Sequence, residues 1–323
     1  MNRRTFICVF GGSVIAAPFA GQAQPASKTP RVGYVSSNRR LATADAFEQG
    51  LRELGYRIGE NIRIEYRFGE GRVDRIPVFV DEVLRLRVDV LFAANPYVIR
   101  VARRATNTVP IVGIDLETDP IEAGWITSLA NPAGNLTGFF LDIPELSGKQ
   151  LQFVADTVPR LQRVAALWDT PLASAQFRAL ETAARTARLD LQSLAVRQAD
   201  EFVGAFDAAR RQRAQTLVVL SSPVVFQHLK RLAELALQYR LPAISIFPQF
   251  AETGGLMGYG PNLLDMYRRA ASYVDRILKG ARPGDLPIQR PTVFNLAVNA
   301  RTARILGLTI PPSVLGRADK VIE

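Results

Sequence analysis

Short apolar segments alternate with amphipathic segments along the first half of the chain. Four mostly apolar segments lie at residues 32–35, 88–94, 111–114 and 135–140, and an alternating one lies at 61–68. Segments apolar throughout are typical of strands covered on both faces of a parallel sheet. Between them, apolar residues recur at helical spacing, as in residues 43–54. A short helix is also expected after Thr118-Asp119-Pro120. The pattern predicts a doubly wound α/β unit.

The same plan repeats in the second half. Strands are expected at residues 164–168, 189–196, 217–220 and 243–247. A connecting helix is expected at 147–158, and others at 172–187, 201–211, 223–239 and 299–306. The second half is therefore predicted to be another α/β unit.

The stretch from Gly254 to Asn299 follows both units and explains how they are joined. It reads as a short strand, a long amphipathic helix, a Pro-rich turn and an alternating strand. We expect it to return the chain to the first unit and then cross again to the second. The predicted lobes are residues 31–145 plus about 258–285, and residues 146–257 plus about 286–323.

The first 23 residues have the features of a signal peptide: a basic pair at Arg3-Arg4, an apolar run at residues 6–19 and a Gly21-Gln22-Ala23 cleavage site. A membrane anchor is less favoured, because the run is shorter than the roughly 20 residues that span a bilayer. Both the twin-arginine and the general secretory routes stay open. Cleavage would remove Cys8, which is the only cysteine. We predict export to the periplasm, with no membrane span in the mature chain.

The formal net charge of +10 does not indicate a nucleic-acid partner. Basic residues are spread singly or in pairs, often beside an acidic residue at i,i+4 as in Glu48–Arg52. No basic run is interleaved with aromatic residues, as a phosphate-binding groove requires. We therefore expect a solvated, arginine-rich surface.

Small polar residues follow the predicted strands at the edge where open α/β sheets bind ligands. These residues are Ser36, Ser37, Asn38, Asn95, Thr118, Asp119, Asp169, Thr170, Ser221 and Ser222. Each group alone is explained by helix N-capping. Together they indicate a polar cleft, and nearby aromatic side chains are expected to form its walls. These aromatic residues are Tyr97, Phe140, Trp168 and Phe247.

The sequence contains few of the residues that known types of catalytic site need. The chain has one histidine, His228, and no cysteine outside the leader, so zinc sites and Cys–His or Ser–His nucleophiles lack parts. No glycine-rich phosphate loop follows a strand. We expect no cofactor, no metal and no enzyme activity, although acid–base chemistry by Asp and Glu alone stays open.

Several motifs together resemble one family. They are residues 47–56 (FEQGLRELGY), 61–67 (NIRIEYR), 118–120 (TDP), 134–138 (GNLTG), 144–149 (PELSGK), 254–261 (GGLMGYGP) and 306–311 (LGLTIP). The chain resembles, from about Arg31 to Glu323, the ABC-transporter substrate-binding family that includes tryptophan and other aromatic-amino-acid binding proteins. The resemblance implies a type I periplasmic-binding fold, with two Rossmann-like lobes joined by three crossovers. It also implies delivery of a small molecule to an inner-membrane ABC permease. We expect the protein to be a monomer.

In the relatives that bind aromatic amino acids, three loops contact the ligand. They correspond here to Ser36 to Asn38, to Thr118-Asp119 and to Asp169 to Ser174. Two segments depart from the family pattern: Phe139-Phe140-Leu141-Asp142 stands for Thr-Ser-Asp, and Trp168-Asp169-Thr170 for Tyr-Asn-Ser.

The expected ligand is an amino acid or a related carboxylate, with Asp142, Asp119 or Glu117 as candidates to receive an ammonium group. Two alternatives stay open: a periplasmic sensor that partners a receptor kinase, and a hydrolase or isomerase built on the same cleft.

Overall fold

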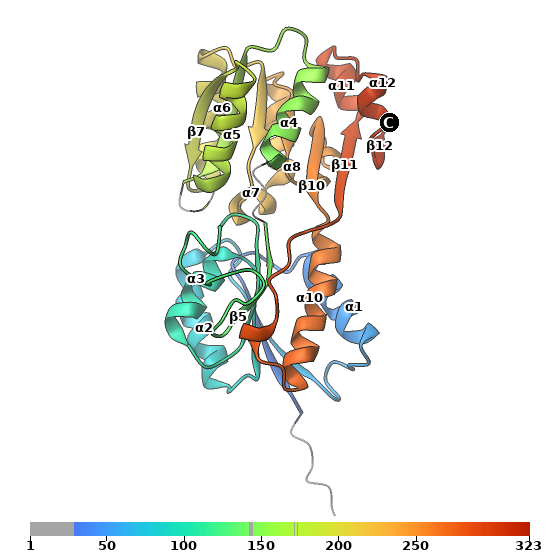
Figure 1. Cartoon of the computed structure of the whole chain (residues 1–323). Helices are drawn as coiled ribbons and strands as arrows, with labels where there is room; N and C mark the ends of the chain where they lie inside the picture. Colours follow the sequence, from blue (N-terminus) through green and yellow to red (C-terminus); the bar gives the residue numbers. More distant parts are fainter. Residues whose placement is uncertain (1–28, 142–144, 171, 173) are drawn as a thin grey trace, which may run out of the picture.

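The computed structural model describes residues 29–141, 145–170, 172 and 174–323. These residues form two lobes, and each lobe has its own sheet (Figure 1). The predicted signal peptide lies outside the described residues.

The first lobe contains a five-stranded parallel sheet in the order β2-β1-β3-β4-β5. Its strands are β1 (Arg31–Ser36), β2 (Arg63–Phe68), β3 (Val90–Ala93), β4 (Ile111–Asp115) and β5 (Leu136–Phe140). Its helices are η1 (Val73–Arg75), α1 (Ala42–Glu53), α2 (Ile76–Arg85) and α3 (Pro96–Ala105). All residues of β3, β4 and β5 are buried, because α1 covers one face of the sheet while α2 and α3 cover the other.

The second lobe contains a seven-stranded sheet in the order β12-β11-β10-β9-β8-β6-β7. Its strands are β6 (Arg163–Asp169), β7 (Asp190–Val196), β8 (Thr216–Val219), β9 (Ala243–Ser245), β10 (Met257–Pro261), β11 (Phe294–Asn299) and β12 (Lys320–Ile322). β10 and β11 are antiparallel, whereas the other neighbouring strands of this sheet pair in parallel. The reason is that β10 ends, and β11 begins, on the side facing the first lobe.

The helices of the second lobe cover both faces of its sheet. They are α4 (Glu145–Thr157), α5 (Ser174–Thr186), η2 (Ala199–Glu201), α6 (Phe202–Arg211), α7 (Pro223–Gln227), α8 (Leu229–Gln238), α9 (Gln249–Glu252), α11 (Ala300–Leu306) and α12 (Pro312–Leu315). α4 and α5 pack on one face, and α6 and α8 on the other. The single helix predicted at 223–239 is divided at His228, whose φ of −120° leaves the helical range.

The chain crosses between the lobes three times. The crossings lie between β5 and α4, between β10 and α10 (Leu263–Leu278), and between η3 (Pro283–Asp285) and β11 (Figure 1). α10 packs against α1 in the first lobe, as expected from the stretch at 254–299. A Cβ at Gly50 would lie 2.1 Å from the carbonyl oxygen of Arg268, so glycine lets these helices approach closely. β10 pairs with β9, which puts the second crossing at Asn262 rather than at about 258.

Residues 120–124, where we predicted a short helix, form turns instead. The carboxylate of Asp119 accepts the backbone N–H groups of Ile121 at 2.8 Å and Glu122 at 3.1 Å. Bonds from a side chain to nearby N–H groups offer the backbone an alternative to a helix. The segment is therefore a loop at the end of β4.

Candidate ligand-binding site

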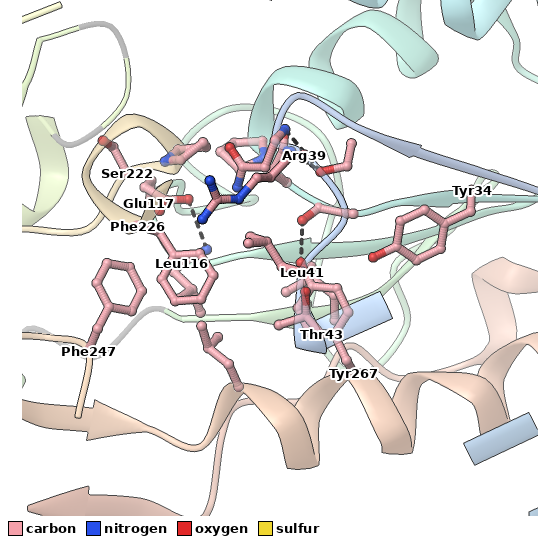
Figure 2. A pocket seen from close by; sticks show the side chains of 18 residues that line it. Tyr34, Arg39, Leu41, Thr43, Leu116, Glu117, Ser222, Phe226, Phe247 and Tyr267 are labelled. Atoms are coloured by element: carbon pink, nitrogen blue, oxygen red, sulfur yellow. Dashed lines mark hydrogen bonds between the residues drawn. The ribbon is translucent and has the colours of Figure 1, made fainter. Parts of the chain in front are cut away.

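A cavity lies between the lobes, where the carboxyl ends of strands from both sheets face each other (Figure 2). The first lobe lines it with residues at the ends of β1, β3 and β4 and from the start of α10. The second lobe lines it with residues that follow β8 and β9. Open α/β sheets bind ligands at this edge.

Aromatic rings form much of the cavity wall. Tyr34 and Tyr267 come from the first lobe, and Phe226 and Phe247 from the second. The ring centroids of Phe226 and Phe247 are 4.7 Å apart. The hydroxyl of Tyr267 donates to the carbonyl oxygen of Ala94 at 2.5 Å, so this buried phenol is hydrogen-bonded. These walls suit the apolar part of a small ligand.

Small polar groups lie at the ends of β1 and β3. The Ser36 hydroxyl accepts the backbone N–H of Asn38 at 3.1 Å and the side-chain amide of Asn95 at 3.4 Å. Asn95 also caps α3 by accepting the N–H of Val98 at 3.3 Å. Ser222 caps α7 in the same way. Capping therefore accounts for Asn95 and Ser222, whereas α1 begins without a side-chain cap.

Arg39 is the cation closest to these polar groups along the chain. Its side chain is exposed, lines the cavity and reaches in among the lining residues (Figure 2). Within the described part of the chain, its guanidinium has no hydrogen bond or ion pair. A guanidinium with free donors is suited to bind a carboxylate in bidentate fashion.

Two carboxyl groups are buried at the end of β4. Asp115 accepts the backbone N–H groups of Glu117 at 2.8 Å and Thr118 at 2.9 Å. Glu117 accepts the hydroxyl of Ser221, which belongs to the second lobe. Burial raises the pKa of Asp115, and burial followed by the neighbouring Asp115 carboxyl raises the pKa of Glu117 well above its usual range.

The lobes are also joined by other polar contacts. The Tyr97 hydroxyl donates to Asp169 at 3.1 Å, and the Gln176 amide donates to the carbonyl oxygen of Leu116 at 2.5 Å. Arg178 forms an ion pair with Glu122 at 3.0 Å. Burial raises the pKa of Asp169 to about 6, although the hydrogen bond from Tyr97 opposes this shift. Together with the Ser221–Glu117 bond, these contacts hold the cleft closed.

Residues 32–322 match the family described as ABC transporter substrate binding protein. The chain belongs to this family. Solute binding rather than catalysis is the family's function, in agreement with the prediction that the chain is not an enzyme. The two lobes and three crossovers of this substrate-binding protein confirm the predicted type I periplasmic-binding fold.

Similar proteins include a tyrosine-binding protein from Clostridioides difficile (strain R20291). It is 22% identical over 273 residues, which cover 81% of this chain and 75% of the relative. A conserved domain protein from Vibrio cholerae has a solved structure with a TM-score of 0.84 at 24% identity, covering 91% of this chain and 100% of that one. An ABC domain from Streptococcus pneumonia in complex with L-Trp has a TM-score of 0.84 at 21% identity, with the same coverage.

The structure brings most of the predicted site residues of this substrate-binding protein to the interface between the lobes. Ser36, Asn38, Asn95, Ser222 and Phe247 line the cavity between the lobes. Ser37 and Tyr97 line an adjoining groove, which also includes Asn38. Asp119 lines a second cavity, and Glu117 lines both cavities. Thr118, Asp169, Thr170 and Ser221 lie beside these spaces without lining them.

Several of these polar atoms have no hydrogen-bond partner among the described residues. They are the hydroxyl oxygens of Ser37, Thr118 and Thr170 and the Oδ1 atom of Asp169. Buried polar atoms are ordinarily hydrogen-bonded. Their concentration at the lobe interface is consistent with a polar ligand site there.

Two predicted aromatic residues do not lie in the cavity, because neighbouring residues of a strand point to opposite faces. Phe140 packs in the first-lobe core between the sheet and α2 and α3, edge-on to Trp125. Trp168 stacks on Phe177 of α5 and donates to Ser193 at 2.8 Å. Asp142 lies outside the described residues. Ser174 begins α5, but its side chain is not described.

Four residues that line the cavity are not among the predicted site residues: Tyr34, Arg39, Phe226 and Tyr267. Tyr34 lies two residues before Ser36 on the same strand, so it points to the same face, and this spacing is a usable signal. The apolar spacing of Tyr267 on its helix gives no such signal, because it is equally typical of a core residue.

In the described ranges, no helix has the length and apolar character needed to cross a bilayer. Across the same residues, no group of three or more His, Cys, Asp or Glu side chains is placed to hold a metal ion.

Proposed function

We propose that this chain is the solute receptor of an ABC importer and that it captures a small carboxylate-bearing ligand, an amino acid or an aromatic acid, between its lobes. The supporting observation is the cavity itself. It is lined by both lobes, with the Arg39 guanidinium among polar groups of the first lobe and four aromatic rings around them. Such a cavity matches a ligand that has a charged end and an apolar body.

In this proposal, Arg39 binds the ligand carboxylate, assisted by Ser36 and Asn38 at the end of β1. The rings of Tyr34, Tyr267, Phe226 and Phe247 hold the apolar part. Two similar proteins support this ligand class, since one is named a tyrosine-binding protein and the other was solved with L-Trp.

The binding cycle follows from the three crossovers. Rotation about these segments would open the cleft and let a solute reach the strand ends. The lobes that move are residues 29–141 with α10 and η3, and the remainder of the described chain. Closure would then re-form the Tyr97–Asp169 and Ser221–Glu117 hydrogen bonds. The predicted leader would place this cycle in the periplasm, where the closed form would meet an inner-membrane permease.

Thermal unfolding in the presence of candidate ligands tests the proposal. A ligand at 1,000 times its Kd adds about 4 kcal/mol to the free energy of unfolding. The panel comprises the common amino acids, their decarboxylated amines and aromatic acids that lack an amino group. We expect carboxylates with an aromatic or large apolar side chain to raise Tm, and the corresponding amines to leave it unchanged. Folded protein whose Tm responds to no carboxylate in the panel would contradict the proposed ligand class.

A further inference from the structure

Two carboxyl groups, those of Asp115 and Glu117, are buried at the end of β4. The proposed role of Arg39 in binding a carboxylate does not explain why they are there. Asp115 and Glu117 are 0% and 5% exposed. The two groups are neighbours, since the Asp115 carboxylate accepts the backbone N–H of Glu117, and burial together with the Asp115 charge raises the pKa of the Glu117 carboxyl. The Oδ1 atom of Asp115 accepts two backbone N–H groups, but its Oδ2 atom has no donor among the described residues.

Among the residues that the structure describes, the groups that contact Glu117 directly carry no positive charge. Its hydrogen-bond donors are the Ser221 hydroxyl and the backbone N–H of Leu116. Tyr97 of α3 and Tyr267 of α10 are close enough to interact electrostatically with it, and both are neutral phenols. Asp119 shares the second cavity with Glu117, and Arg39 shares the first.

Two neighbouring buried carboxyl groups cannot both be ionised at low cost. We therefore expect the pair to hold one proton when the cleft is closed, and this proton would supply a donor for the Oδ2 atom of Asp115. An ammonium group supplies the same positive charge and N–H donors. Glu117 can reach such a group, because its side chain lines both cavities.

We propose that Glu117, positioned by Asp115, receives the ammonium group of an amino-acid ligand, and that the proton held by the pair leaves to solvent as the ammonium binds. This inference rests on the proposed function and selects amino acids over aromatic acids without an amino group. The charges balance. One proton and two carboxylates carry −1 before binding, and two carboxylates with one ammonium carry −1 afterwards.

Titration calorimetry tests the proposal with L-phenylalanine and 3-phenylpropionate, which differ by the amino group. Each titration is run at about pH 7 in phosphate and in Tris, whose ionisation enthalpies differ, so that the buffer dependence of the heat gives the number of protons released. We expect phenylalanine to bind at least about tenfold more tightly and to release up to about one proton.

Three variants separate the roles. Glu117→Gln keeps an acceptor for Ser221 and should weaken phenylalanine at least about tenfold, abolish proton release and leave 3-phenylpropionate unchanged. Asp115→Asn keeps an acceptor for the backbone N–H groups. This variant should retain phenylalanine binding but release fewer protons. The reason is that Glu117 then lacks the neighbouring carboxyl group that, besides burial, raises its pKa. Glu60→Gln, on the exposed surface, is the control and should match the wild type.

The outcomes distinguish this inference from the proposed function. Equal affinities for the two ligands, or proton release that persists in Glu117→Gln, would leave the carboxylate ligand class standing and overturn the role of Glu117. If neither these ligands nor any other carboxylate in the thermal panel binds folded wild-type protein, the proposed function fails and this assignment fails with it.

Discussion

The two lobes contribute different chemistry to the same cavity. The first lobe lines it with Arg39, Glu117 and small polar groups at its strand ends. The second lobe lines it with Ser222, Pro223, Phe226 and Phe247, so no charged side chain of that lobe lines the cavity in the described part of the chain.

This difference indicates a division of labour. The charged residues to which we assign ligand selection, Arg39 and Glu117, both line the cavity from the first lobe. The second lobe brings apolar surface that removes water when the cleft closes. Electrostatic interactions strengthen as water leaves. The second lobe can therefore strengthen the binding of a ligand to the charged groups of the first lobe without contributing a charge itself.

The largest expected effect is on the free energy of unfolding. It comes from a substitution where α10 packs against α1, and it tests whether α10 belongs to the first lobe. Gly50→Ala places a Cβ 2.1 Å from the carbonyl oxygen of Arg268, and we expect it to lower the free energy of unfolding by about 1–3 kcal/mol or more. The matched control is Gly204→Ala on α6, where nothing lies within 4 Å of the added atom. That change should stabilise the second lobe by about 0.5–1 kcal/mol. Urea unfolding followed by circular dichroism measures both, and an unchanged Gly50→Ala midpoint would refute the assignment of α10 to the first lobe.

A smaller effect separates the charged wall from the apolar wall. Arg39→Gln should weaken phenylalanine about tenfold to a hundredfold and phenylalanine amide hardly at all, because only the acid carries the carboxylate. Phe226→Ala should weaken both ligands equally, by up to about tenfold, because it removes apolar contact alone. The exposed Arg57→Gln serves as the control. Calorimetry measures the affinity of each variant for both ligands. If Arg39→Gln weakened both ligands equally, the proposed difference between a charged first-lobe wall and an apolar second-lobe wall would be wrong.

The smallest effect concerns the bond that joins the lobes at Tyr97 and Asp169. The pKa of Asp169 is about 6 in the closed cleft against an ordinary value of 3.8, so the closed form binds its proton more tightly. Closure should therefore become more favourable as pH falls from about 6 towards 3.8, and this gain should be lost as pH rises through 6.

Small-angle scattering of the ligand-free protein measures the change as a smaller radius of gyration at pH 5 than at pH 7. Asp169→Asn should flatten this dependence. Tyr97→Phe should open the cleft at both pH values, by about 1 kcal/mol at most. A pH response that is the same in Asp169→Asn and wild type would assign it to other groups, such as the Asp115–Glu117 pair.

Most of the fold could be predicted from the sequence, because buried parallel strands and amphipathic helices leave strong periodic patterns. The stretch at 254–299 even revealed the return to the first lobe. The antiparallel pairing of β11 depends on where the crossovers enter the second sheet, which local patterns do not encode. β12 was missed because two of its three residues are exposed, so it lacks the apolar signature of the other strands.

The site was less predictable. Polar residues at strand ends mark the edge of a sheet, and this located Ser36, Asn38 and Ser222. The face to which an aromatic side chain points depends on strand register, and the local sequence pattern does not fix that register at Phe140 and Trp168. Arg39 resembles any other exposed arginine of this basic chain until the loop after β1 is placed against the second lobe.

Gln176 holds a further consequence. Its side-chain amide donates to the Leu116 carbonyl of the first lobe, while its oxygen accepts the backbone N–H of Ser221 at 3.0 Å. One side chain thus ties the main chains of the two halves together, regardless of what solute is enclosed. In the proposed cycle, the rate at which a solute dissociates would then depend partly on these two hydrogen bonds, whatever the solute is. Delivery to a permease would require that they break.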